Sequence, residues 1–310
     1  MTDLASPSPH FRLERFAEGI TAAIATDDGF GLCNSGIIDL GDSTVVFDSM
    51  LTPQAADDLR RVAERLTGHP VAYLVNSHYH GDHIRGNGSF PSVRIVSTQK
   101  VRELIDERAA KALESDQRSA VTDIEDLRAG RISAGPRDRR IFEGWFQGIL
   151  ATPRGLLIPG PDMFVEDRLV LRGTKRELWV MTFGGGHSPS DVLAYCPEKR
   201  IAFLGDLLSV GFHPSVGDGF PTEWIRILGS VRRLGIHWAL PGHGSVGREA
   251  DIATLQDYLR ALVRLANSAR RQGHTRADLN SVPIPSEFSD WCFRLFFAEN
   301  LARAFDLLPA

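Results

Sequence analysis

The sequence predicts an α/β protein whose strands are gathered in two separate stretches, each accompanied by helices. Short β-rich runs punctuated by glycine fill residues 20–47 and 71–75, and a second set occupies residues 169–240. The chain has 310 residues, of which 43% are hydrophobic and 24% charged, so it can bury a sizeable core. We therefore expect a single domain, residues 1–310. Two such halves would suit two β-layers that face each other, although periodicity alone does not establish this.

The elements of the first half can be assigned from their punctuation. The β-rich runs are 20–25, 35–40, 43–47 and 71–75. Between the last two, Thr52 is a suitable N-cap, Pro53 suits the first helical turn, and apolar residues keep helical spacing until Gly68. The sequence thus predicts a helix that connects two strands.

The middle of the chain differs from both halves. Residues 100–165 begin as a charge-balanced helical pattern and end in an apolar stretch that contains Trp145 and Phe146. We expect a helical insertion, which would be either a lid over a substrate pocket or a helix that packs its apolar stripe on the core.

The second half repeats the alternation of strands and helices. Its strands are expected at 169–171, 177–182, 192–195, 201–204 and 236–240, and its helices at 223–234 and 249–270. The tail, about 275–310, is aromatic-rich from Phe288 onward and is expected to be helical and to pack on the core.

A dense cluster of polar residues follows the run that ends at Val75. Residues 78–83 read His-Tyr-His-Gly-Asp-His. Neutral imidazole and carboxylate are the usual ligands of zinc, and they also suit iron and manganese. Four such groups are hard to explain as packing, because each buried polar group needs a partner of its own. The cluster therefore predicts a metal site.

Three further candidates stand at the ends of apolar runs, each close to glycine. They are His187, Asp206 and His243. Glycine lets the backbone turn sharply and approach a metal, and strand ends are rigid platforms for ligands. With His78, His80, Asp82 and His83 the set reaches seven, which is too many for one tetrahedral zinc and fits two metals that share a carboxylate.

Four separated motifs carry a resemblance to the metallo-β-lactamase superfamily. They are HxHxDH at 78–83, GGGHSPSD at 184–191, LGD at 204–206 and PGHG at 241–244, in the family's order. The resemblance implies a four-layer αββα sandwich with the metals at one edge of the sheets. It also implies that His78, His80 and His187 bind one metal, that Asp82, His83 and His243 bind the other, and that Asp206 bridges them. Because Asp206 stands where some lactamases have cysteine, the broader branch similar to glyoxalase II and lactonases is favoured.

The resemblance implies a dinuclear hydrolase. Two divalent ions, zinc first with iron or manganese as alternatives, would hold a bridging hydroxide that attacks the carbonyl of a small ester, thioester, lactone or lactam. Asp82 would be the acid–base residue that orients it. One alternative is a mononuclear iron enzyme similar to persulfide dioxygenases, in which His83 and His243 would bind no iron. Another is a phosphodiesterase or nuclease.

Supporting residues follow from general metal-site chemistry. A metal-bound imidazole usually donates its other N–H to a carboxylate, and Asp48 and Asp191 are candidates for that role. Each is equally well explained as a turn or helix-capping aspartate. The substrate pocket is expected to involve aromatic and imidazole side chains near these motifs. They are Tyr79, Trp145, Phe146, Phe212 and His213.

Composition limits the partners. The formal net charge of −4 gives no basic footprint for nucleic acid, so a small-molecule substrate is expected instead. The three cysteines are widely spaced, and neither a signal peptide nor a membrane-spanning run is recognisable, so we expect a cytoplasmic protein without a membrane partner. The sequence does not set the oligomeric state.

Overall fold

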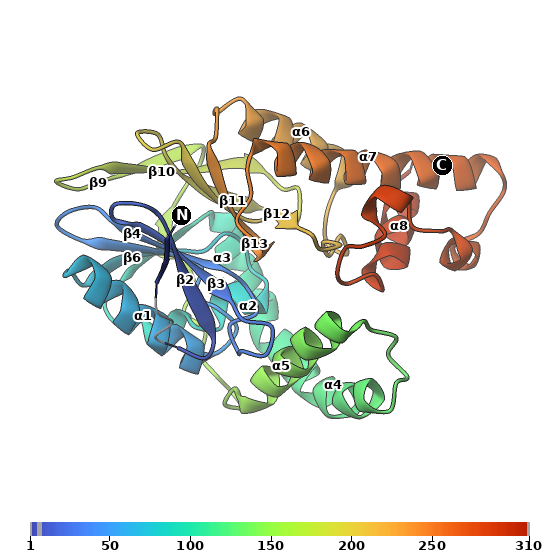
Figure 1. The fold of residues 1–310 in the computed structure, drawn as a ribbon, viewed down its shortest axis with the longest axis horizontal. Helices are drawn as coiled ribbons and strands as arrows, with labels where there is room; N and C mark the ends of the chain where they lie inside the picture. Colours follow the sequence, from blue (N-terminus) through green and yellow to red (C-terminus); the bar gives the residue numbers. More distant parts are fainter. Residues whose placement is uncertain (1, 5–7, 309–310) are drawn as a thin grey trace.

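The structure is a computed structural model that describes residues 2–4 and 8–308. Two β-sheets face each other and helices cover their outer sides, so the predicted four-layer αββα arrangement is confirmed (Figure 1). Among the described residues, no helix has the length and apolar character needed to cross a membrane.

The first sheet follows chain order from one edge to the other. Its strands are β1 (Thr2–Leu4), β2 (Phe11–Ala17), β3 (Ile20–Ala25), β4 (Ser35–Asp39), β5 (Thr44–Phe47), β6 (Val71–Val75), β7 (Arg94–Ser97) and β8 (Met163–Phe164). Pairing is antiparallel from β1 to β5 and parallel from β5 to β8. Neither β1 nor β2 was expected from the sequence.

Helix α1 (Pro53–Thr67) makes the crossover between β5 and β6. Its Ala55 N–H donates to the Thr52 side chain, and the helix ends at Gly68, whose φ of +75° suits glycine. Its apolar stripe, which includes Leu59, packs on the outer face of the first sheet. The N-cap, the proline and the terminal glycine therefore act as the sequence predicted.

The second sheet has the order β13-β12-β11-β10-β9. Its strands are β9 (Arg168–Arg172), β10 (Glu177–Gly184), β11 (Asp191–Cys196), β12 (Ile201–Val210) and β13 (Trp238–Gly244). Only β12 and β13 pair in parallel among them. Helices α6 (Pro221–Arg232) and α7 (Glu249–Arg271) cover its outer face.

The inner faces of the two sheets form the central core. Side chains from the first sheet, such as Phe47, meet those of the second, such as Phe203, with ring centroids 5.8 Å apart. Because β3, β5, β11 and β12 are buried along almost their whole length, their near-continuous apolar runs are explained by cover on both faces. This packing fixes the sheet edge at which the polar motifs meet.

Two helical segments lie outside the sandwich. The first contains α3 (Gln99–Leu104), a π-helical turn (Ile105–Ala109), α4 (Ala110–Arg128) and α5 (Pro136–Ala151), and in Figure 1 its last two helices project away from the sheets. The second contains 3₁₀ turns at Arg276–Ser281 and Ser286–Phe288, then α8 (Phe296–Asp306), which packs against α7. The tail is thus α-helical over a shorter range than predicted, because Phe293 has a φ of +61° and interrupts any helix through this region.

Candidate metal centre

The 78–83 motif lies where β6 leaves the first sheet. His78 and His80 are in the loop after this strand, and Asp82 and His83 belong to the single turn of α2 (Gly81–Ile84). His78 and His83 are almost completely buried, with 1% and 0% of their surface exposed. The short helix turns the chain back so that four side chains of one hexapeptide face the second sheet.

The second sheet supplies the other three candidates. His187 lies in the loop after β10, whereas Asp206 and His243 lie within β12 and β13 rather than beyond their ends as the sequence analysis expected. The strands continue because their pairing shifts register around Gly205, which has a φ of +50°. Gly242 is required for a different reason: a Cβ there would stand 1.8 Å from Asp206 Oδ1.

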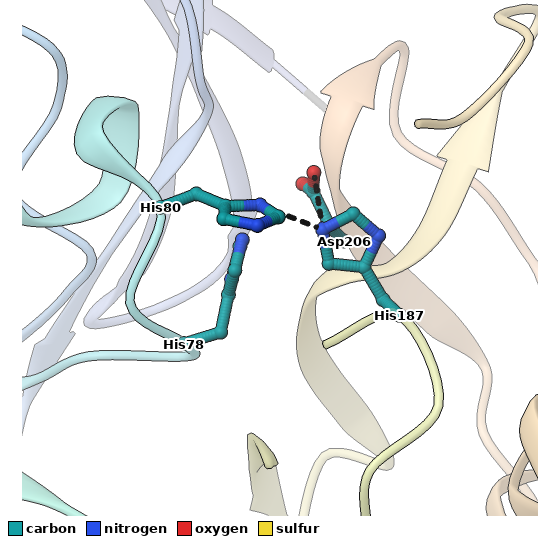
Figure 2. Close-up of side chains that lie close together, drawn as sticks. All are labelled: His78, His80, His187 and Asp206. Carbon is teal, nitrogen blue, oxygen red and sulfur yellow. Dashed lines mark hydrogen bonds and ion pairs between the residues drawn. The ribbon is translucent and has the colours of Figure 1, made fainter. Parts of the chain in front are cut away.

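Four of the seven candidates converge in one group. His78 and His80 point from the first sheet toward His187 and Asp206 from the second (Figure 2). One donor atom from each lies within 4.8 Å of the others. His187 Nε2 is 3.0 Å from His80 Nδ1 and 3.4 Å from Asp206 Oδ2.

The remaining three candidates form a second group. Donor atoms of Asp82, His83 and His243 also lie within 4.8 Å of one another. Asp82 Oδ2 is 3.4 Å from His83 Nε2 and 3.3 Å from His243 Nε2. Asp206 contacts this group as well, because its Oδ1 is 3.3 Å from His83 Nε2 and its Oδ2 is 3.4 Å from His243 Nε2. One carboxylate therefore touches both groups.

Several atoms at this centre are buried without a hydrogen bond. His78 Nε2, His83 Nε2 and Asp206 Oδ1 have no hydrogen-bond partner among the described residues. Buried polar atoms normally have a hydrogen-bond partner. Lone pairs that converge on one point without a hydrogen-bond donor between them are what a bound cation requires. The donor set of imidazoles and carboxylates fits divalent ions of the zinc, iron or manganese kind.

The electrostatics of the two groups differ in an informative way. Burial lowers the pKa of His187 to about 3 and that of His78 well below its usual value, which keeps both imidazoles in the neutral form that binds metals. Although burial opposes it, Asp206 and Asp82 raise the pKa of His243 to about 10. The carboxylates therefore favour positive charge at the second group, which a cation would supply.

Asp48 fixes the orientation of His83. Its Oδ2 lies 2.8 Å from His83 Nδ1 and accepts the Ser77 hydroxyl at 2.8 Å, while its Oδ1 accepts the Ser77 backbone N–H at 2.7 Å. A carboxylate at Nδ1 holds the proton there and leaves Nε2 free as a ligand. Ser77 Oγ also lies 2.9 Å from His78 Nδ1, so one serine supports two imidazoles.

Asp191 has a different role from Asp48. It accepts the backbone N–H groups of Gly186, His187 and Ser188 at 2.7, 2.9 and 3.1 Å, so these bonds support the loop rather than an imidazole ring. This is the turn-capping alternative for that residue. It follows from geometry, because a carboxylate four residues after His187 folds back onto the backbone of the same tight loop.

Two supporting residues were not singled out from the sequence. Asp218 Oδ2 lies 3.4 Å from His80 Nε2 and also accepts the Tyr79 hydroxyl. Burial and Asp218 raise the pKa of Tyr79 to about 12, so the phenol remains a donor, and Arg108 donates to the phenol oxygen at 3.3 Å. This chain connects a candidate ligand to the helical insertion.

The other missed residue is Asn34, which is buried beside β13. Its side-chain amide donates to the carbonyls of Pro241 and Gly244 at 3.0 and 2.9 Å, and its backbone N–H donates to Gly242. These bonds hold the end of β13, and with it His243, against the first sheet. The carbonyls that accept these bonds lie on both sides of His243 in the chain. No local sequence pattern identifies Asn34 as their partner.

A cavity of about 500 Å³ opens onto the centre. His80, Asp82, Asp206 and His243 are part of its lining. Four of the predicted pocket residues line it as well, namely Tyr79, Trp145, Phe212 and His213. Phe146 does not: it stacks on Phe142 and Trp145, because successive residues on a helix point in different directions and only Trp145 faces the cavity.

Comparison with known proteins assigns the family. A family model described as the metallo-beta-lactamase superfamily matches residues 28–243, which is most of the chain. The chain belongs to this superfamily, and the matched region of the chain contains all seven candidate ligands.

Individual relatives are distant. The type 2 metallo-beta-lactamase of Bacteroides fragilis is 29% identical over 103 residues, which are 32% of this chain and only 41% of that protein. A metallo-beta-lactamase from Pontibacter korlensis has a TM-score of 0.59 at 15% identity, covering 81% of this chain and 99% of its own. The DIM-1 metallo-beta-lactamase has a TM-score of 0.58 at 16% identity, and the match covers 82% of this chain and 98% of that one. These structures share the fold, and part of this chain has no counterpart in them.

Proposed function

We propose that the chain is a metal-dependent hydrolase with two divalent ions, acting on the carbonyl of a small ester, thioester, lactone or lactam. The observation that carries this proposal is the position of Asp206, whose two oxygens lie 3.3–3.4 Å from imidazoles of both groups. A single shared carboxylate between two ligand groups is the arrangement that a dinuclear centre needs.

The proposed ligand sets follow the two groups. His78, His80 and His187 would hold one ion, Asp82, His83 and His243 the other, and Asp206 both. When bound, such ions supply Lewis acidity and lower the pKa of a coordinated water molecule towards neutrality. Zinc is the first candidate, with iron or manganese as alternatives.

The chain's own groups would orient the reactants. Asp82 lines the cavity, and its side chain is 16% exposed, so it can reach a bound water molecule. His83 and His243 outweigh its burial and hold the pKa of Asp82 well below its usual range, so the carboxylate accepts hydrogen bonds at neutral pH. In this role Asp82 would orient the attacking water molecule by accepting a hydrogen bond from it.

The alternatives are less well supported by the geometry. A mononuclear iron centre leaves no role for the second group, in which Asp48 already fixes the tautomer of His83 for ligation through Nε2. A nuclease would need a basic surface to bind phosphates, whereas the formal net charge is −4.

Metal content and hydrolysis, measured on the same preparations, test the proposal. Protein purified without added metal should contain close to two ions per chain and should hydrolyse at least one member of a lactone, thioester, ester and β-lactam panel. His80→Ala and His243→Ala should each lose metal and turnover, whereas His237→Ala, at an exposed position outside both groups, should lose neither. One iron per chain that persists in His243→Ala, without hydrolysis, would refute the dinuclear hydrolase.

A further inference from the structure

The cavity beside the metal centre is walled mainly by apolar side chains on the side away from the ligands. Its volume of about 500 Å³ is within the usual range for a small-molecule site. Trp145 from α5, Phe212 from the loop after β12, and Phe293 and Phe296 from the C-terminal segment form one wall. The two C-terminal residues lie beyond the matched range 28–243, so the family match covers only part of this wall.

Phe293 holds this wall together. Its ring stacks on Phe142 at 5.0 Å and contacts Phe212 at 5.1 Å and Phe296 at 5.3 Å. Its φ of +61° is unfavourable for a residue with a side chain, and its N–H donates to the buried Asp138 at 3.2 Å. The surrounding contacts therefore keep an aromatic ring at the cavity wall in a strained backbone conformation.

The charged side chains of the cavity outside the metal groups are paired with one another. Arg85, which is 3% exposed, pairs with Asp116 of α4. Arg108 donates to the Tyr79 hydroxyl, which in turn donates to Asp218. Because these charges already compensate each other, a charged substituent of a substrate would gain little in this cavity and would lose its hydration.

We propose that this cavity binds the acyl part of the substrate, and that this part is an uncharged apolar chain or ring. The cavity adjoins His80, Asp82, Asp206 and His243, so a carbonyl at the centre would place its acyl group between the helical insertion and the C-terminal segment. This inference rests on the proposed hydrolase function, and it adds the class of substrate: esters or thioesters of apolar carboxylic acids.

A homologous series tests the acyl assignment. With one leaving group and acyl chains from acetyl to octanoyl, kcat/KM should rise about fourfold per added methylene until the cavity is filled. A flat or falling dependence on chain length would overturn the proposal.

Ala112 offers a variant with little risk to folding. It lines the cavity, yet it is exposed on α4, so Ala112→Phe narrows the cavity without filling the core. This variant should retain hydrolysis of the acetyl ester and lose at least tenfold in kcat/KM for the octanoyl ester. Val121→Phe, on the same helix but exposed and outside the cavity, should leave both values unchanged. Equal effects of the two variants on the octanoyl ester would overturn the proposal.

A binding measurement separates this inference from the proposed function. Hydroxamic acids with acyl chains from acetyl to octanoyl can be titrated calorimetrically into the metal-loaded protein, and this measurement requires no turnover. Affinity that increases with chain length in the wild type, and not in Ala112→Phe, supports the acyl site even if no ester is hydrolysed. Hydrolysis of esters together with affinities independent of chain length would retain the hydrolase and refute the acyl site.

Discussion

Replacing Asp48 by asparagine is the most direct test of how the second ligand group is held. Asp48 Oδ2 lies 2.8 Å from His83 Nδ1 and fixes the proton on that nitrogen. In Asp48→Asn, the amide oxygen would still accept the Ser77 N–H, and the NH₂ group would then face His83 Nδ1. The imidazole would move its proton to Nε2 to accept this donor, and Nε2 is the atom that the metal needs.

The size of the effect follows from the contacts that change. Loss of a carboxylate behind a metal-bound imidazole typically costs 10–100-fold in affinity, which is about 1.4–2.7 kcal/mol. The apoprotein should change less. Burial raises the pKa of Asp48, so removing the charge offsets part of the loss of its hydrogen bonds. We expect a change within about 1 kcal/mol in the free energy of unfolding without metal.

Competition with a chromogenic chelator would measure the affinities of the two ions, and denaturant unfolding of the apoprotein would measure stability. In Asp48→Asn one of the two affinities should fall by the amount above. Asp39→Asn is a matched control, because Asp39 is also a buried carboxylate with a backbone and a side-chain donor, namely Gly41 and Lys175, but is not part of either ligand group. Two unchanged metal affinities in Asp48→Asn would refute the tautomer argument.

Three further changes should have distinct effects. Asp218→Asn removes the carboxylate at His80 Nε2 and should lower the affinity for the ion of the first group. Chelator competition should therefore show a loss at the site that Asp48→Asn leaves unchanged. Gly242→Ala places a Cβ 1.8 Å from the carboxylate shared by both groups and should reduce metal content at both. Gly229→Ala should bind both ions, because its Cβ would be in ordinary contact with Gln256 Nε2 at 3.6 Å. Burial lowers the pKa of His213 to about 4, so the unfolded state, with a pKa near 6.5, binds more protons between these values. The contribution of His213 to stability should therefore fall from pH 6.5 to 4 and level off below. The free energy of unfolding should depend less steeply on pH over this range in His213→Phe than in the wild type, and an identical slope in denaturant titrations would contradict the assignment.

The sequence predicted the parts of the fold that depend on local signals. Helix α1 was defined by Thr52, Pro53 and Gly68, whose roles act within a turn of their own positions. Strand β2 was missed because Arg12, Glu14 and Arg15 interrupt its apolar pattern. The tail was expected to be helical throughout because aromatic spacing cannot reveal a single residue with positive φ such as Phe293.

At the site, too, residues with a local sequence signal were predicted and residues without one were missed. The ligand candidates were recognisable because histidine and aspartate beside glycine, after an apolar run, are rarely explained by packing alone. Asn34 and Asp218 were not, since each acts on residues more than a hundred positions away in the chain, namely Pro241 and His80. A short polar residue in a loop carries no local sign of such a contact.

The position of the centre links its chemistry to the stability of the fold. One part of the ligand set, residues 78–83, follows β6 of the first sheet, and the other part, His187, Asp206 and His243, lies in or directly after strands of the second. Without a metal, buried donor atoms such as His83 Nε2 and Asp206 Oδ1 face each other with no hydrogen bond, which costs free energy. A metal bound by both parts would remove this cost only when the sheets are packed together. Binding free energy at the centre is therefore also a contribution to the packing of one sheet on the other.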